Sequence, residues 1–310
     1  MTSLNILTPT YLALFATTLL LSACSGGGSS DGESSSLPSN LPINANEEIP
    51  VNPEQTGMFD NLNSTPIGGD FPNDGVNADL TGVLIPTILA TETSIDLAYA
   101  QAGAALIEQV NGSLLIPVDI NVVFADCGAA NAFFVPSPVS IDPSIEVTPG
   151  TVVMCHELTE LFSQFFNTPE EGFQASSFVL MHELGHALVK VLDLPVVGLE
   201  EVFVDAVSAV FLGESGLGEG TLLAGIFFGA QGATPFFDTH RAGPQRLGDL
   251  GCWGIGADPS LLDDPITAML AAGLMAGGRD CPMEYAELVS SLDEVLGDNI
   301  VGGLNLIDGQ

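Results

Sequence analysis

The sequence is nearly without basic residues: four Lys and Arg stand against 39 Asp and Glu, and the formal net charge is −35 over 310 residues. Lys190 is the first Lys or Arg along the chain. So little positive charge cannot match nucleic-acid phosphates, which excludes DNA and RNA as partners. Anionic lipid headgroups should repel the chain for the same reason. We interpret the acidity as a means of staying soluble in a salty medium, where ions screen like charges from one another.

The apolar run near the N-terminus, YLALFATTLLLSAC, has no basic residue before it and is too short for a comfortable membrane span. It ends in LSAC, which resembles the bacterial lipobox, whose cysteine is lipidated and becomes the first mature residue. We therefore expect a lipoprotein-type signal peptide over residues 1–24, with an ordinary secretory signal as the alternative. Lipidation would anchor the protein outside the cytosol, to the bacterial cell envelope through Cys24, at the outer membrane if the cell has one.

The next segment is poor in apolar residues. Residues 25–78 are rich in Gly, Ser, Pro and Asn and carry only acidic charges, a composition that is typical of a disordered tether. We expect residues 79–310 to form the folded domain, which shows no internal repeat.

The cysteines never occur at CxxC spacing, which makes a thiolate metal site unfavourable. Besides Cys24 the chain has Cys127, Cys155, Cys252 and Cys281, and an even number in an exported protein predicts two disulfides. Among the three possible pairings we favour Cys127 with Cys155 and Cys252 with Cys281, because each closes a short local loop. Each bridge would contribute roughly 3–4 kcal/mol to stability in the loop-entropy model.

The folded part mixes helical and strand patterns. Helical periodicity covers 93–110, about 173–192 and 199–214, and the second of these should end before Pro195. Alternating β-branched residues predict a strand within 116–126. Residues 151–166 fit either a strand that runs into a helix or a single helix.

The segment VLMHELGHALVKVLDLP, residues 179–195, has two histidines four positions apart and a glutamate directly after the first. On a helix His182 and His186 project from one face, while Glu183 lies about 100° round the axis. This H-E-x-x-H pattern offers zinc two nitrogens and places a carboxylate where it can take a proton from zinc-activated water. The alternative is a pair of hydrogen-bonded core histidines, since the neighbouring positions are apolar.

The following helix offers a third ligand, because a catalytic zinc usually takes three ligands from the protein. Glu201, Asp205 and Ser208 form a polar stripe on an otherwise apolar helix. We predict that Glu201 is the third ligand and that Asp205 orients a ligand histidine. Glu200 faces another way and is better placed as a charge at the helix N-terminus. The alternative for Glu201 and Asp205 is a helix-end charge and a solvent-facing acid.

H-E-L-G-H followed by E-x-x-x-D on a second helix resembles the gluzincins, the thermolysin-like branch of the zincin metallopeptidases. The chain is more similar still to a bacterial family of metallopeptidases of unknown function, over about residues 95–290. The segments that carry this similarity are DCGAANAFFVP (126–136), MCHELTELF (154–162), HELGHALVKVLDLPVVGLEEVFVDAVSA (182–209), DTHRAGPQRL (238–247), GCWGIGADP (251–259) and CPMEYAEL (281–288). The second helix departs from the usual EEDAAD-like pattern, since it contains EEVFVD, but the ligand positions are retained.

The resemblance implies an α+β, zincin-like fold, with a small sheet packed on the HExxH helix and a mostly helical C-terminal half. It implies that INVVFADCGAANAFF (120–134) flanks the cleft, where an extended peptide could add to the sheet edge. It also implies a group that stabilises the oxyanion, for which His240 or Arg246 could serve. The alternative is a local network of Asp238, His240 and Arg241 that holds a loop.

We therefore expect a tethered lipoprotein with a zinc-dependent peptidase domain, in which Glu183 is the general base and the substrate is a peptide or protein. One alternative is a non-catalytic, zinc-stabilised binding protein of the envelope. Another is a zinc amidase that acts on cell-wall material. Replacing Glu183 by Gln separates the first alternative from the enzyme, and a panel of peptides and muropeptides separates the second.

Overall fold

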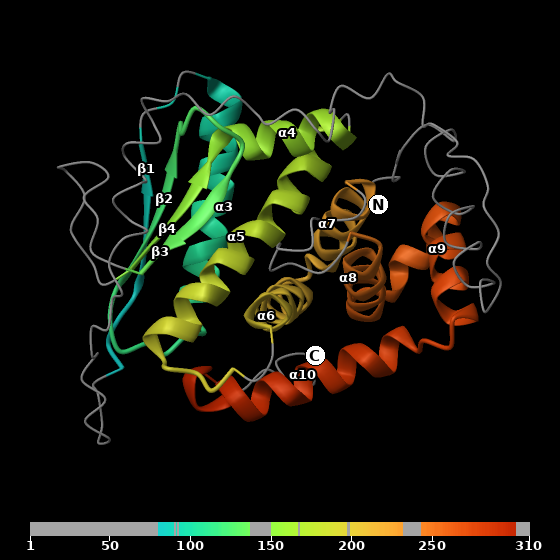
Figure 1. Ribbon diagram of the computed structural model, residues 1–310. Helices are drawn as coiled ribbons and strands as arrows, with labels where there is room; N and C mark the ends of the chain where they lie inside the picture. Colours follow the sequence, from blue (N-terminus) through green and yellow to red (C-terminus); the bar gives the residue numbers. More distant parts are fainter. Residues whose placement is uncertain are drawn as a thin grey trace, which may run out of the picture. The chain divides into compact units, whose positions relative to one another are not determined.

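A computed structural model of the chain describes residues 80–89, 91, 93–136, 150–166, 168–196, 199–231 and 243–301. Within these residues the fold is α+β, as predicted, with one four-stranded sheet and eight α-helices. In Figure 1, α5 lies between the sheet and the helices α6–α10. The predicted signal peptide and tether, with Cys24, lie outside the described residues, as does His240.

The sheet has the strand order β1-β2-β4-β3. Its strands are β1 (Leu84–Ile88), β2 (Ile120–Ala125), β3 (Ala132–Val135) and β4 (Gly150–Cys155). β1, β2 and β4 are parallel, and β3 pairs antiparallel with β4 at the edge. β2 and β4 are buried along their whole length, because central parallel strands are covered on both faces. β3 is therefore an edge strand of this sheet.

Two helices directly follow strands of the sheet along the chain. α3 (Ser94–Asn111) begins at Thr93, whose side chain accepts a hydrogen bond from the Asp96 amide, and it connects β1 to β2. α4 (His156–Phe166) follows β4 without a loop, so that the strand-then-helix alternative for residues 151–166 is the one observed.

α5 (Pro169–Val191) begins about four residues earlier than its apolar periodicity predicts. Its first turn is polar, so that the periodic signal is absent there, but Thr168 caps it by accepting from the amide of Glu171. The Glu171 carboxylate in turn contacts the Thr168 hydroxyl at 2.6 Å, and Pro169 stands at the first helical position. Capping residues, rather than apolar spacing, therefore define where this helix starts.

The C-terminal half is helical, as predicted. It comprises α6 (Glu200–Glu214), α7 (Gly218–Ala230), α8 (Gly243–Ala257), α9 (Pro265–Ala276) and α10 (Cys281–Leu296). α7 packs closely along α8 at glycines: a Cβ on Gly229 would lie 2.9 Å from the Leu247 side chain. None of the helices in the described ranges is long and apolar enough to cross a bilayer.

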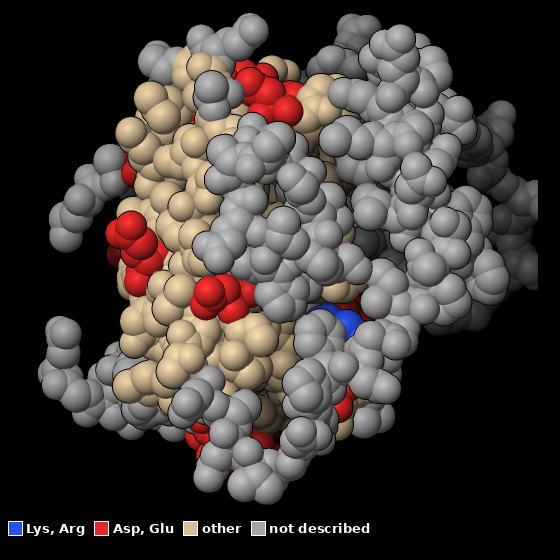
Figure 2. All heavy atoms as spheres, turned by 90° about the vertical axis from the view of Figure 1, so that its left-hand side faces the viewer, with Lys and Arg blue, Asp and Glu red and all other residues tan. Residues whose placement is uncertain are grey.

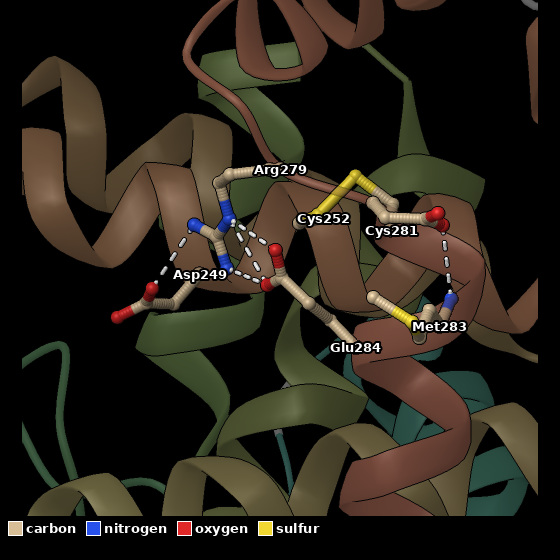
Figure 3. Close-up of a disulfide and its surroundings, with 7 residues drawn as sticks. Asp249, Cys252, Arg279, Cys281, Met283 and Glu284 are labelled. Atoms are coloured by element: carbon tan, nitrogen blue, oxygen red, sulfur yellow. Dashed lines mark hydrogen bonds and ion pairs between the residues drawn. A yellow bond between two sulfur atoms is a disulfide. The ribbon is translucent and has the colours of Figure 1, made fainter.

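Both predicted disulfides are present. Cys127, after β2, is bonded to Cys155 at the end of β4, and Cys252 on α8 is bonded to Cys281 on α10. Beside the second bridge, Figure 3 shows Arg279 between the carboxylates of Asp249 and Glu284. The bridge and this ion pair therefore join α8 and α10 at the same place.

Candidate metal centre

The two histidines of the HExxH motif lie one turn apart on α5, and their ring centroids are 4.9 Å apart. His182 is buried and His186 is partly exposed. The apolar side chains around them, Leu184, Ala187 and Leu188, are fully buried. The helix is therefore held in the core by its apolar face, while the two imidazoles project together from its other side.

A glycine inside the motif lets α6 approach α5. A Cβ on Gly185 would lie 2.9 Å from Cβ of Val204, a distance that real Cβ atoms essentially never show. The close crossing brings Glu201, in the first turn of α6, opposite the two imidazoles. Its Oε2 lies 3.2 Å from Nε2 of His182 and 3.5 Å from Nε2 of His186.

These three atoms fit the ligand set of a zinc ion. With ligand bonds of about 2.0–2.2 Å, neighbouring ligand atoms of a tetrahedral site lie about 3.4 Å apart. The two distances from Glu201 match that spacing, and the three ligand atoms all lie within 4.8 Å of one another. Two imidazoles and one carboxylate, with a further position open, are the ligands of a catalytic rather than a structural zinc site.

The other nitrogen of each histidine contacts a carboxylate. Nδ1 of His182 lies 2.8 Å from Oδ1 of Asp205, and Nδ1 of His186 lies 2.7 Å from Oε1 of Glu200. Because a carboxylate can only accept, each Nδ1 donates a proton in these contacts, and Nε2 is the ring nitrogen on the side of Glu201, where it would bind a metal ion. Asp205 thus lies where the sequence predicts. We expected Glu200 to be only a charge at the helix N-terminus. It does lie in the first turn of α6, but its side chain also contacts His186.

The site is strongly coupled electrostatically. Burial lowers the pKa of His186, but its hydrogen bonds with Glu201 and Glu200 outweigh this and raise that pKa to about 9. Burial raises the pKa of Asp205, but the hydrogen bond from His182 and the charge of Arg246 hold it below its ordinary value. Asp205 is therefore an anion at neutral pH.

Arg246, from α8, binds Asp205 and lies behind the metal centre. Its Nε and Nη2 donate to the two oxygens of Asp205, at 2.9 and 2.6 Å. The Arg246 side chain is buried, and it is not among the described residues that line the cleft beside the metal centre. The structure therefore gives no support to an oxyanion role for Arg246. The same role for His240 stays a prediction, since this residue lies outside the described ranges.

Glu183 lies beside the three ligand atoms. Burial raises the pKa of its carboxyl group, against the opposite influence of His182 and His186. The carboxylate also accepts a hydrogen bond from the backbone N–H of Phe134 on β3. This contact joins the HExxH helix to the edge strand, and no pattern in the sequence indicates it.

A cleft of about 610 Å³ opens at this point. β3 forms one wall, and α5 and the start of α6 form the other. The lining residues are Ala132, Phe133, Phe134, Pro136, His182, Glu183, His186, Val189, Lys190, Asp193, Leu194, Glu200 and Glu201. A hollow that is apolar along the strand and polar at its floor can hold an extended chain above the metal ligands.

One further group of potential ligands occurs in the described ranges. Cys127, Cys155 and Glu157 lie within metal-ligand distance of one another, but both sulfurs are in the disulfide and cannot act as thiolates. His156 lines a separate, water-sized cavity of about 10 Å³ next to α3 and α5. The HExxH centre is therefore the candidate metal site of the described part of the chain.

Two histidines one helical turn apart, a carboxylate from the next helix and an intervening glutamate are the pattern that is typical of metallopeptidase centres. The comparison with protein families agrees: the model of a family described as "Putative metallopeptidase" matches residues 91–296, and the chain belongs to that family. Neither the curated proteins nor the solved structures include a significant match to the chain.

Proposed function

We propose that the protein is a zinc-dependent metallopeptidase that hydrolyses peptide bonds with Glu183 as general base. One observation carries this proposal: Nε2 of His182, Nε2 of His186 and Oε2 of Glu201 converge beside Glu183 at the floor of the cleft. A pair of core histidines, the alternative from the sequence, would not need a cleft or a carboxylate shared between them.

Each residue of the site would have a separate role. His182, His186 and Glu201 would hold the zinc ion, which supplies a Lewis acid for the scissile carbonyl and lowers the pKa of water to about 7. Glu183 would accept a proton from the attacking water and pass it to the leaving amine. The Phe134 N–H binds the Glu183 carboxylate and holds it toward the cleft. We propose His240 for stabilisation of the oxyanion.

We propose that the substrate is a peptide or protein that lies along β3. This strand pairs with β4 on one side only, and in the described part of the sheet no strand pairs with its other side. An extended peptide could add there through backbone hydrogen bonds, with its carbonyl above the ligand atoms.

We propose that the protein is attached to the cell envelope through a lipid on Cys24, with residues 25–78 as the tether. The LSAC ending supports this, and so do the two disulfides, because such bridges persist in oxidising compartments. Labelling with a radioactive fatty acid, with Cys24→Ser as control, tests the attachment. A wild-type chain that takes up no label would contradict it.

The first test of function is the metal content and turnover of the full chain. We expect about one zinc per chain, loss of zinc in His186→Ala, and retention of zinc in Glu183→Gln. The Gln variant keeps the ligands but cannot accept a proton, so its peptide turnover should fall by at least about 100-fold.

Elemental analysis and a panel of peptides and muropeptides provide the measurements. A wild-type chain that binds no zinc would contradict the metal site. A wild-type chain that binds zinc but cleaves no peptide or muropeptide would favour the non-catalytic binding protein. Cleavage of muropeptides alone would favour the amidase.

A further inference from the structure

The two histidine ligands are held by unequal partners. Asp205, the partner of His182, is buried, whereas the side chain of Glu200, the partner of His186, is 48% exposed. Water can therefore compete for Glu200 but not for Asp205. A buried carboxylate is costly unless its oxygens are fully bonded, so something must hold Asp205 in place.

Arg246 provides that support. Its guanidinium donates from two nitrogens to the two oxygens of Asp205, in the bidentate geometry that restricts rotation of a carboxylate. The guanidinium carbon also lies 3.8 Å from the centre of the Phe228 ring on α7. An Arg between a ring and a carboxylate has few alternative rotamers, and it keeps its charge at any pH that the fold survives.

We infer that Arg246 is a positioning residue of the metal centre, which acts on the zinc ion through Asp205 and His182. This inference rests on the metal site of the proposed function. Oδ1 of Asp205 accepts from both Arg246 and His182, so that the arginine fixes the acceptor that orients the imidazole. With Nδ1–H held in this way, Nε2 of His182 is aimed at the ion before it binds.

Zinc affinity should therefore depend on Arg246 of α8. Arg246→Met leaves Asp205 buried with a hydrogen bond from His182 but without the arginine, and we expect zinc to bind about 10-fold more weakly. Arg246→Lys keeps the charge but loses the second hydrogen bond, and should fall between the wild type and the Met variant. Asp205→Asn should weaken zinc binding by itself. Adding Arg246→Met to it should change nothing more, because the arginine then has no carboxylate to orient.

The measurement is the zinc dissociation constant of the full chain, by competition with a coloured chelator, together with thermal unfolding of each variant. Arg279→Met is the matched control, because Arg279 also bridges two carboxylates, Asp249 and Glu284, away from the centre. It should lower stability and leave zinc affinity unchanged. Arg246→Met alone leaves the buried charge of Asp205 without its arginine and could fail to fold. The double variant Asp205→Asn, Arg246→Met removes both charges, so its zinc affinity can then be compared with that of Asp205→Asn.

Two results would overturn the inference while the proposed function stands: wild-type zinc affinity in Arg246→Met and Arg246→Lys, or a double variant that binds zinc clearly more weakly than Asp205→Asn. A wild-type chain that binds no zinc would instead contradict the proposed function itself.

Discussion

The two histidines of the centre show how much a ligand depends on the residue behind it. His182 is supported by a buried ion pair that reaches α8, and His186 by an exposed glutamate at the start of α6. In both contacts Nδ1 donates to the carboxylate, and Nε2 lies on the side of Glu201. They differ in rigidity, because a buried bidentate pair excludes the water that can replace an exposed carboxylate.

This difference gives a prediction for single residues. We expect Glu200→Gln to weaken zinc binding by less than about 10-fold, and Asp205→Asn to weaken it by more than that. A glutamine oxygen can still accept from Nδ1 of His186, and water can reach the site. Chelator competition on both variants provides the comparison, and a larger loss in Glu200→Gln would show that exposure does not decide the strength of these partners.

At the scale of elements, the centre exists because α5 and α6 cross closely at Gly185. Nothing larger than hydrogen fits between this position and Val204, so that the glycine of HELGH sets the distance from the imidazoles to Glu201. The disulfides act at the same scale. Cys127–Cys155 joins the two ends of the segment that contains β3, the strand that lines the cleft.

Gly185→Ala should therefore damage the metal site without touching a ligand. We expect overpacking to destabilise the fold by about 1–3 kcal/mol and to weaken zinc binding by moving α6 away. The matched control is Gly273→Ala on α9, where a Cβ would meet nothing within 4 Å. That change should be neutral or stabilising by up to about 1 kcal/mol. Equal zinc affinity in Gly185→Ala and the wild type would contradict this account of the crossing.

The contact between α8 and α10 predicts a pH dependence. The hydrogen bonds from Arg279 hold the pKa of Glu284 below its ordinary value, despite the opposite influence of burial. A carboxyl group with a lowered pKa stabilises the fold above its unfolded value of about 4.3, and this contribution is lost as the pH falls toward the lower folded value. Both side chains are partly exposed, so the contribution should be about 1 kcal/mol or less.

Thermal unfolding of the wild type and Glu284→Gln between about pH 3 and pH 7 measures this effect. The stability difference between the two should be largest near neutral pH and should vanish at the acid end. A difference that persists unchanged at low pH would show that Glu284 acts through packing rather than charge.

At the scale of the whole molecule, the metal centre lies where the sheet-bound helix α5 meets the helical half. Two of the candidate ligands come from α5 and one from α6, so that an ion would connect the two parts of the core (Figure 1). The protein is strongly acidic: on the face shown in Figure 2, described acidic side chains occur in several separate groups, and basic atoms are visible at one place. A cation at the centre would reduce this excess of negative charge.

Zinc should therefore stabilise the whole fold. At a free zinc concentration 100 times the dissociation constant, the free energy of unfolding should rise by about 2.7 kcal/mol. Glu183→Gln should show the same gain, because Glu183 is not a ligand, and His186→Ala should show little. Chemical unfolding with and without zinc provides the measurement. An equal gain in His186→Ala would place the stabilising ion elsewhere.

Much of this could be predicted from local patterns. The helices predicted over 93–110 and 199–214 are Ser94–Asn111 and Glu200–Glu214 in the structure, because long periodic runs with clear ends leave few alternatives. The pairing of Cys127 with Cys155 and of Cys252 with Cys281 was predicted because each bridge closes a short loop of the chain. The stripe with Glu201 and Asp205 identified two acids that face His182, since positions four apart on a helix share a face whatever packs against it.

What the sequence by itself determined is therefore the content of the site: two histidines, a glutamate between them and two acids on the next helix, each placed by helical spacing. Only the tertiary structure decided what lies behind and opposite them. The contacts from Glu200 to His186, from Phe134 to Glu183 and from Arg246 to Asp205 join different elements. Their geometry depends on how side chains interlock between those elements, which the spacing within a single helix or strand does not contain.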